Sequence, residues 1–592
     1  MIKPVMLADV SLSYKTKEEF ENVVVKMKDG LQTFLEMNFD DITNSKLKDF
    51  VAQYNNMMGM IEYTYTYLNV QYFSDTRKNE LLKESEPIHE VIDSFELKVS
   101  KLSEQLVAFG SEKVLELIRK DEELKVWEEL FSSKIRRQVG ILTPEQHKEK
   151  ALYTKEFTKN SLKAQELGNK PVVKPFIKDG KKLTEDEENV ISIDPTQDRD
   201  LRKQIFIHSF EDKRDNDKEV TSGVANYINK RTEYLKKFGY DSYQQFISQK
   251  RDEAPGFAKG VMQTSKELYK ELHSKYISKL NEYRKTSFNL EKIQPWDEKA
   301  YPSKIVPIPL KEIIDFYQNE VKDIFPKESK YIIDNFSIEG TLAILESEHK
   351  YNGAAATWTG NNNIYYVTQS YIDSNPYSAS TLAHEMGHTM HIVAAKLNKP
   401  IEEARFSLAI GEAVADTFSM LFAFASMDKE TEYAKTIAYE ALARLLSVTN
   451  KFATTTLAED TLYEMAWKGE TITPEIIREV VYKENLSIKP NNKPTVVDGI
   501  DLTKKGSVLG YFSMDNHYTY SSYTISFILA IYLADQIRSG NTETFIRILN
   551  MGGEEYSTNT ILEKVGIDIN SEEVKNVVLK TSEEITNYII NK

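Results

Sequence analysis

The sequence predicts a large, mainly helical protein with one small β-sheet. Residues 1–140 place apolar residues three and four positions apart, as in FENVVVKMKDGLQTFLEM, and contain little Gly or Pro. The same periodicity returns at Leu201 and dominates the chain after Ser378. The one β-rich stretch is residues 353–373, where IYYVT follows a Gly-Asn cluster typical of a turn.

The length and the loops suggest two domains. A chain of 592 residues is longer than one hydrophobic core usually serves. Residues 168–200 carry NKPVVKPF, DGKK and DPTQDRD, a polar composition typical of a loop or domain junction. We therefore predict an N-terminal helical domain over residues 1–195 and a second domain over residues 196–592. Further loops are expected over residues 293–310, 487–500 and 503–516.

Composition excludes several classes of function. The net charge is −15, and nucleic acids and anionic membranes bind clustered Lys and Arg, so neither is an expected partner. The chain has no cysteine, which excludes disulfides, thiolate catalysis and Cys-ligated metal sites. Any transition-metal site must therefore use His, Asp and Glu.

We expect a soluble, cytoplasmic protein. The segment MIKPVMLADVSLSYKTKEEF lacks the apolar core and cleavage site of a signal peptide. The most apolar long stretch, residues 406–427, contains Glu412 and Asp416. Acidic groups are costly in the middle of a membrane span, so a buried helix with functional acids explains this stretch better.

The segment STLAHEMGHTMHIVAAKL predicts a metal-binding helix. His384 and His388 are one helical turn apart on one face and can bind a single Zn²⁺. Glu385 lies beside the first of them, where its carboxylate can accept a proton from water at the metal. His391 continues the same face, but we expect a structural or cleft-wall role, because a fourth protein ligand would close the site. The small Gly387 is expected to leave room for ion and substrate. An apolar stripe is predicted on the opposite face, formed by Leu382, Met386, Met390, Val393 and Leu397.

A catalytic zinc needs a third protein ligand, for which we predict Glu412. It lies in the apolar segment RFSLAIGEAVADTFSMLFAF, where an acidic residue without a role would be unfavourable. The interval from His388 to Glu412 suits the end of one helix, a turn and an antiparallel second helix. Asp416, one turn further on, is a candidate to accept the N–H of a ligand histidine.

A further segment offers donors for the oxyanion that forms during hydrolysis at a carbonyl. GYFSMDNHYTYSSYTISF contains His517, Tyr518, Tyr520 and Tyr523, and it follows a loop with two glycines that can flex. An alternative is that these rings line an apolar core. The IYYVT strand is expected to be able to pair with an extended peptide.

These segments together carry a family resemblance. HEMGHTMH, GEAVADTF and HYTYSSY resemble the motifs of the M3 metallopeptidases, most of all the oligoendopeptidase F branch. Where that branch has further tyrosines, this sequence has Ile525 and Phe527. Other stretches across the chain agree with the branch, namely YTYLNVQYFSDT, KKFGYDSYQQF, NLEKIQPWDEKA and FIRILNMGGEEYSTNTILEKVGIDI.

The resemblance implies a helical, clam-like body with a deep channel that admits short, unstructured peptides. It implies one Zn²⁺ held by His384, His388 and Glu412, and it makes Glu385 the general base and then the acid. It also assigns catalytic roles to two residues near the C-terminus, His517 and Tyr523. The predicted function is a zinc-dependent endopeptidase of short oligopeptides. The alternatives are a carboxypeptidase or dipeptidyl carboxypeptidase on the same scaffold, or a catalytically silent peptide-binding protein.

Overall fold

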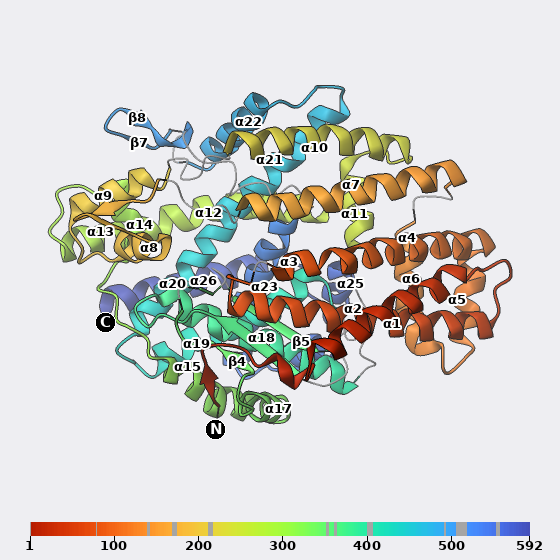
Figure 1. Ribbon diagram of the computed structural model, residues 1–592. Coiled ribbons are helices and arrows are strands. Elements are labelled where there is room, and N and C mark those ends of the chain that lie inside the picture. The colour runs from red at the N-terminus through yellow and green to blue at the C-terminus, as the bar shows by residue number, and fades with distance from the viewer. Residues whose placement is uncertain are drawn as a thin grey trace.

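A computed structural model describes most of the chain (Figure 1). It covers residues 2–592 apart from the following positions: 79, 139–141, 169–173, 211–216, 348, 351–353, 360–363, 399–405, 490–492, 505–517 and 552–556. The described residues are mostly helical, with few and short strands, as the sequence predicts.

The N-terminal helices share an aromatic core. Phe34 contacts Phe95 and Phe50, with ring centres 4.7 and 6.0 Å apart, and Phe50 in turn contacts Phe131 at 5.6 Å. These four side chains are almost completely buried. The helices of this group are α1 (Lys17–Glu36), α2 (Asn44–Ser74), α3 (Glu80–Glu84), α4 (Glu86–Phe109), α5 (Ser111–Arg119) and α6 (Glu128–Arg136). The next helix, α7 (Pro144–Gly168), packs against α4 and α10 (Asp217–Lys237).

The middle of the chain contributes shorter helices. They are α8 (Glu185–Ile193), α9 (Arg199–His208), α10 (Asp217–Lys237), α11 (Tyr243–Arg251), α12 (Phe257–Leu272), α13 (Ser278–Ser287), α14 (Pro295–Lys299), α15 (Leu310–Phe316), α16 (Lys322–Ile324) and α17 (Pro326–Phe336). Much of this region packs into the same large core as the C-terminal helices. The proposed domain boundary at residue 195 stays a prediction.

The expectation of a loop over residues 168–200 is wrong in part. A two-stranded hairpin, β2 (Ile177–Lys178) and β3 (Lys181–Lys182), precedes α8 there. Thr184 caps this helix: its side chain accepts from the backbone N–H of Glu187, and the Glu187 side chain accepts from the backbone N–H of Thr184. This reciprocal capping stabilises a short helix in a sequence whose polar composition conceals it.

A mixed four-stranded sheet lies beside the site described below. Its order is β1 (Pro4–Val5), β4 (Leu342–Ala343), β6 (Ile364–Gln369) and β5 (Ala354–Thr359). β6 pairs in parallel with β4 and antiparallel with β5, so the IYYVT strand is not free to accept a further strand. Among the described residues β5 and β1 form the two edges instead. A separate hairpin, β7 (Val496–Val497) with β8 (Ile500–Asp501), lies within a region expected to be loop.

The C-terminal helices surround one very apolar helix. α19 (Leu408–Asp428) packs against both α18 (Pro376–Asn398) and α23 (Thr519–Arg538). Among the described residues α19 is the one helix long and apolar enough to cross a membrane, yet 89% of that stretch is buried inside the protein. The remaining helices are α20 (Ala434–Ser447), α21 (Ala453–Trp467), α22 (Pro474–Ser487), α24 (Glu543–Asn550), α25 (Thr558–Val565) and α26 (Glu572–Asn591).

Gly387 allows α18 and α19 to approach closely. A Cβ atom at this position would lie 2.9 Å from the Cα of Ala415 and 2.8 Å from the Phe418 ring. Both distances are shorter than normal contacts, and the Ala415 atom belongs to a helix backbone that cannot move by itself. The expectation that Gly387 leaves room for an ion and substrate is therefore wrong, because the space is filled by the neighbouring helix.

We expect Gly387→Ala to lower the free energy of unfolding by about 1–3 kcal/mol, the usual cost of overpacking a core. Gly260→Ala is the matched control, because Gly260 is also within a helix but has no atom within 4 Å of the added Cβ. That control should leave stability unchanged or raise it by up to about 1 kcal/mol. Chemical denaturation of both variants measures the difference. Equal stabilities would contradict the packing role of Gly387.

Candidate metal centre

Three side chains from two helices converge on one point. α18 presents His384 and His388 one turn apart, and α19 presents Glu412 opposite them. The Nε2 atoms of His384 and His388 lie 3.2 and 3.6 Å from the carboxylate oxygens of Glu412. The ligand atoms all lie within 4.8 Å of one another, a spacing that suits a shared metal ion.

The site favours a positive charge at its centre. Burial opposes a charge on His384, but the carboxylates of Asp416 and Glu412 outweigh this effect and raise the pKa of the imidazole to about 10. Burial also opposes the charge of Glu412, yet His388 and His384 lower the pKa of that carboxyl to about 2. Burial lowers the pKa of His388. Two carboxylates beside two imidazoles therefore stabilise a cation here, whether a proton or a metal ion.

Asp416 orients the first of these histidines. Its Oδ1 lies 2.7 Å from Nδ1 of His384, and this leaves Nε2 to face Glu412 and the centre of the cluster. The Ser526 hydroxyl of α23 donates to the other oxygen of Asp416 at 3.1 Å. The guanidinium of Arg444, on α20, lies 2.5 Å from Oδ1. An acceptor held from three helices fixes both the tautomer and the ring orientation of His384.

Sequence reasoning missed Arg444 and Ser526. Arg444 lies in AYEALARLL, an apolar helix in which a guanidinium needs a buried acidic partner. That requirement is a usable signal, although it does not identify Asp416 as the partner. Ser526 carries no comparable signal, since a serine in a buried helix most often bonds its own backbone.

Glu385 lies next to the ligands without being part of the group that they form. It follows His384 in α18, and only 7% of the residue is exposed. Its carboxylate acts to raise the pKa of both His388 and Tyr523, so it lies near both of these side chains.

Tyr523 of α23 faces the same cluster. Burial raises the pKa of its phenol, and the carboxylates of Glu412, Asp416 and Glu385 raise it further while Arg444 opposes them. The phenol therefore stays protonated and able to donate a hydrogen bond. Its ring packs against Phe452 at 5.8 Å between ring centres. His517, its predicted companion, lies outside the described residues.

Three other aromatic residues singled out in the sequence have different surroundings. Tyr518 is fully buried and turned away from the cluster, with its hydroxyl donating to Asp460 of α21 at 2.5 Å. Tyr520 packs against Phe452 at 4.8 Å. His391 is completely buried and stacked on Phe406, with ring centres 3.7 Å apart, and burial lowers its pKa to about 3. A neutral, stacked ring is a packing element, not a fourth ligand.

A cleft of about 1060 Å³ begins at the N-terminal turns of α18. One wall is formed by these turns and by the end of β6, through Ser378, Thr381 and Gln369. The opposite wall is formed by α8 and the β2–β3 hairpin. The volume is at the upper end of the range of ligand pockets. Of the three ligands His388 is the most exposed, at 18% of its side chain.

Two curated proteins are similar to this chain over most of its length. The oligoendopeptidase F homolog of Borreliella burgdorferi is 22% identical over 590 residues, which are 95% of this chain and 94% of that protein. Oligopeptidase PepF of Bacillus subtilis is 21% identical over 493 residues, or 81% of this chain and 71% of its own length. The chain is similar in sequence to oligoendopeptidase F proteins over most of its length. The resemblance seen in the sequence is thereby confirmed, although no protein-family model matches the sequence.

Solved structures of peptidases share the fold of this chain. PZ peptidase A, crystallised with an inhibitor, superposes with a TM-score of 0.71 at 15% identity and covers 95% of this chain and 97% of its own. Oligoendopeptidase F from Enterococcus faecium gives a TM-score of 0.63 at 15% identity, with coverages of 97% and 99%. The predicted fold class, a mainly helical body with a small sheet, is confirmed.

We expect Asp416→Asn to weaken metal binding about 10–100-fold, because an amide is a poorer acceptor for the His384 N–H than a carboxylate. Ser526→Ala is the matched control: it removes one neutral hydrogen bond to the same carboxylate and should cost less than about tenfold. Titration of the metal-free variants with Zn²⁺ measures both affinities. Wild-type affinity in Asp416→Asn would contradict the orienting role.

Proposed function

We propose that this protein is a zinc-dependent endopeptidase that hydrolyses short oligopeptides. The observation that carries the proposal is the convergence of two imidazoles and a carboxylate, with the Glu385 carboxylate beside them and the Tyr523 phenol on the facing helix. The homologues support the peptidase class, since they are named oligopeptidase and oligoendopeptidase F.

The donor set fits zinc. Two histidine nitrogens and one glutamate oxygen are a common ligand set of catalytic zinc sites, in which the remaining position is left for water or substrate. The Nδ1 of His384 is already bonded to Asp416, so the Nε2 is the atom that would bind a metal ion. A zinc ion in this position supplies Lewis-acid chemistry: it polarises a carbonyl group and makes water a stronger acid.

Glu385 moves the proton in this proposal. Its carboxylate takes a proton from the attacking water as the C–O bond forms at the scissile carbonyl. It then gives this proton to the amide nitrogen as the C–N bond breaks, so that an amine leaves. The position of Glu385 next to a ligand, yet outside the ligand group, supports this role.

Tyr523 stabilises the developing oxyanion. Its phenol remains protonated, since burial and three carboxylates raise its pKa, so it can donate to the carbonyl oxygen. The Phe452 ring holds the Tyr523 ring in place. His517 is proposed as a second donor by motif position alone.

The cleft and the sheet edge support a peptide substrate. An extended peptide can pair with the edge strand β5, which packs against the metal-binding helix α18. A cleft of about 1060 Å³ is lined by Thr381, one helical turn before His384, and has room for a short segment of chain. Short, unstructured peptides are therefore the proposed substrates.

We expect cleavage of a peptide whose N-terminus is acetylated and whose C-terminus is amidated, giving one product that keeps the acetyl group and one that keeps the amide, as identified by mass spectrometry. A chelator should abolish the cleavage, and added Zn²⁺ should restore it. Cleavage that requires a free C-terminus would replace the proposal by a carboxypeptidase or dipeptidyl carboxypeptidase. Binding of peptides without any cleavage would replace it by a peptide-binding protein.

Substitutions of Glu385 and Glu412 should impair the enzyme in different ways. Glu385→Gln is expected to keep stoichiometric zinc and lose about 10²–10⁴ in kcat, the range for loss of an acid–base group. Glu412→Ala is expected to lose the zinc itself, because only two protein ligands remain. Metal content and peptide turnover, measured on both variants, separate the roles. Near-normal turnover in the first variant, or full zinc in the second, would refute the respective assignment.

A further inference from the structure

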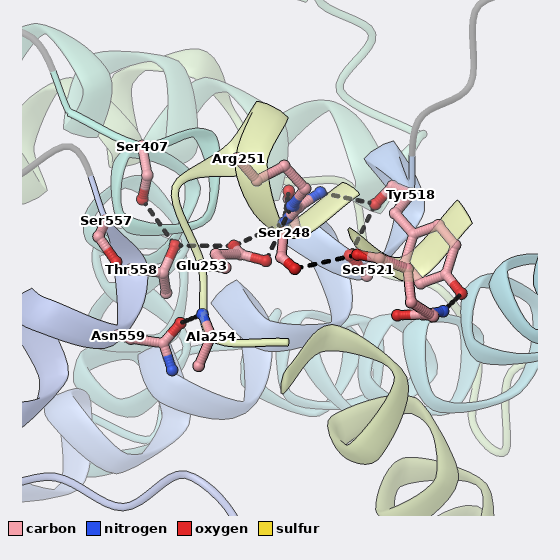
Figure 2. Close-up of polar contacts among 12 residues, drawn as sticks. Ser248, Arg251, Glu253, Ala254, Ser407, Tyr518, Ser521, Ser557, Thr558 and Asn559 are labelled. Carbon is pink, nitrogen blue, oxygen red and sulfur yellow. Dashed lines mark hydrogen bonds and ion pairs between the residues drawn. The ribbon is translucent and has the colours of Figure 1, made fainter. Parts of the chain in front are cut away.

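The turn that ends α11 lies where three helices begin (Figure 2). The turn contains Arg251, Asp252 and Glu253, and the left-handed backbone of Asp252, with φ of 53°, directs the two flanking side chains toward each other. Arg251 and Glu253 form a two-point ion pair with both distances 3.0 Å. The Glu253 side chain is only 3% exposed and that of Arg251 is 14% exposed.

Arg251 binds the first turn of α23. One guanidinium nitrogen donates to the backbone carbonyl of Tyr518 at 2.9 Å, and the other donates to the hydroxyl of Ser522 at 2.9 Å. Ser522 is the residue before Tyr523 in the same helix. The guanidinium thus fixes both the origin and the rotation of the helix segment that carries the phenol.

Glu253 extends the same network to α25 and α19. Its Oε1 accepts from the Thr558 hydroxyl at 3.3 Å, and Thr558 lies 2.9 Å from the hydroxyl of Ser407. Ser407 caps α19, the helix of the metal ligand Glu412. Figure 2 shows these residues as one chain of contacts from Ser407 to Tyr518.

The turn is also bound to the N-terminal helices. Asp252 accepts two hydrogen bonds from Arg136 of α6, at 3.0 and 2.7 Å. Arg136 also pairs with Glu129 of the same helix. The three residues of the turn therefore connect a helix of the N-terminal group with the two helices that carry Glu412 and Tyr523.

The charge of Arg251 is unusual for its place. Helix N-termini carry a partial positive charge, so a cation beside the start of α23 is less favourable than an anion would be. Glu253 offsets this cost by pairing with the guanidinium. A helix N-terminus is usually stabilised by a Ser, Asp or Asn side chain at the cap position. The cap residue of α23 is Tyr518, whose side chain makes no hydrogen bond of this kind. The contact is better suited to setting the position of the helix than to stabilising it.

We infer that Arg251 is a positioning residue for the hydrolytic reaction, and that it acts through Tyr523. By holding the Tyr518 carbonyl and the Ser522 hydroxyl, it sets the distance from the phenol to the metal ligands on α18 and α19. This inference rests on the proposed function, because it assumes that Tyr523 donates to the oxyanion. A displacement of about 1 Å in such a donor can cost about 100-fold in rate.

A double-mutant cycle tests the inference on the full-length, zinc-loaded protein. Arg251→Ala is expected to lower kcat about 10–100-fold, with KM changed less than about threefold and zinc content unchanged. In a Tyr523→Phe background the same change should lower kcat by less than about threefold, because the group through which Arg251 acts is gone. Arg202→Ala is the matched control. Arg202 is also buried, bonded to Asp297 and to a backbone carbonyl, and away from α23. It should leave kcat within about threefold.

Amide hydrogen exchange measures how firmly the start of α23 is held. Amides in the first two turns of α23 should exchange at least about tenfold faster in Arg251→Ala than in wild type, and at the wild-type rate in Arg202→Ala. If Arg251→Ala does not fold, Ser522→Ala removes one of the two contacts and should show the same pattern at smaller size. Equal losses of kcat in both backgrounds, or unchanged exchange, would overturn the inference. Wild-type kcat in Tyr523→Phe alone would instead refute the proposed role of Tyr523, and the exchange experiment would then decide the positioning role by itself.

Discussion

The close contact of α18 with α19 at Gly387 is the constraint on which the rest of the site depends. Without a side chain at this position, the backbone of Ala415 comes within normal contact distance of the metal-binding helix. Glu412 and Asp416 lie on the same helix as Ala415, within one turn of it, so they reach the two sides of the His384 ring. A wider spacing of the helices would move these carboxylates away from the imidazole. The contact at Gly387 therefore determines both how α18 and α19 pack and how the carboxylates lie against the imidazole.

The parts of the site that the sequence predicts are those set by helix geometry. The spacing of His384 and His388 places both on one face of any α-helix, whatever surrounds it. Glu412 could be predicted because a carboxylate in an apolar helix is costly to bury unless it binds a partner. Arg444 and Ser526 could not be selected, because their partner, Asp416, is reached only through the packing of α20 and α23 on α19. The orientation of Tyr518 could not be predicted for the same reason. Its side chain is held by a hydrogen bond to Asp460 of α21, which the local sequence motif does not reveal.

The fold shows a similar division. Long helices were predictable because their apolar periodicity extends over many turns, and the short elements were not. α8 depends on a reciprocal cap between Thr184 and Glu187, which a polar composition hides. β6 is an internal strand because it pairs with β4. β4 has only two residues, and no local sequence pattern predicts it. Likewise, the link from Arg251 to Ser522 joins residues 271 positions apart, and only the structure shows it.

The order of the site residues along the chain has a consequence for folding. The three candidate metal ligands come from consecutive helices, so closing the loop between them costs little chain entropy. Tyr523 joins from a helix far downstream, and its arrival requires the whole intervening chain to fold. In the proposed zinc enzyme, a metal ion would stabilise this local pair of helices before the phenol reaches its place. Metal binding and the gain of activity would then be separate events during folding, and the first would not require the second.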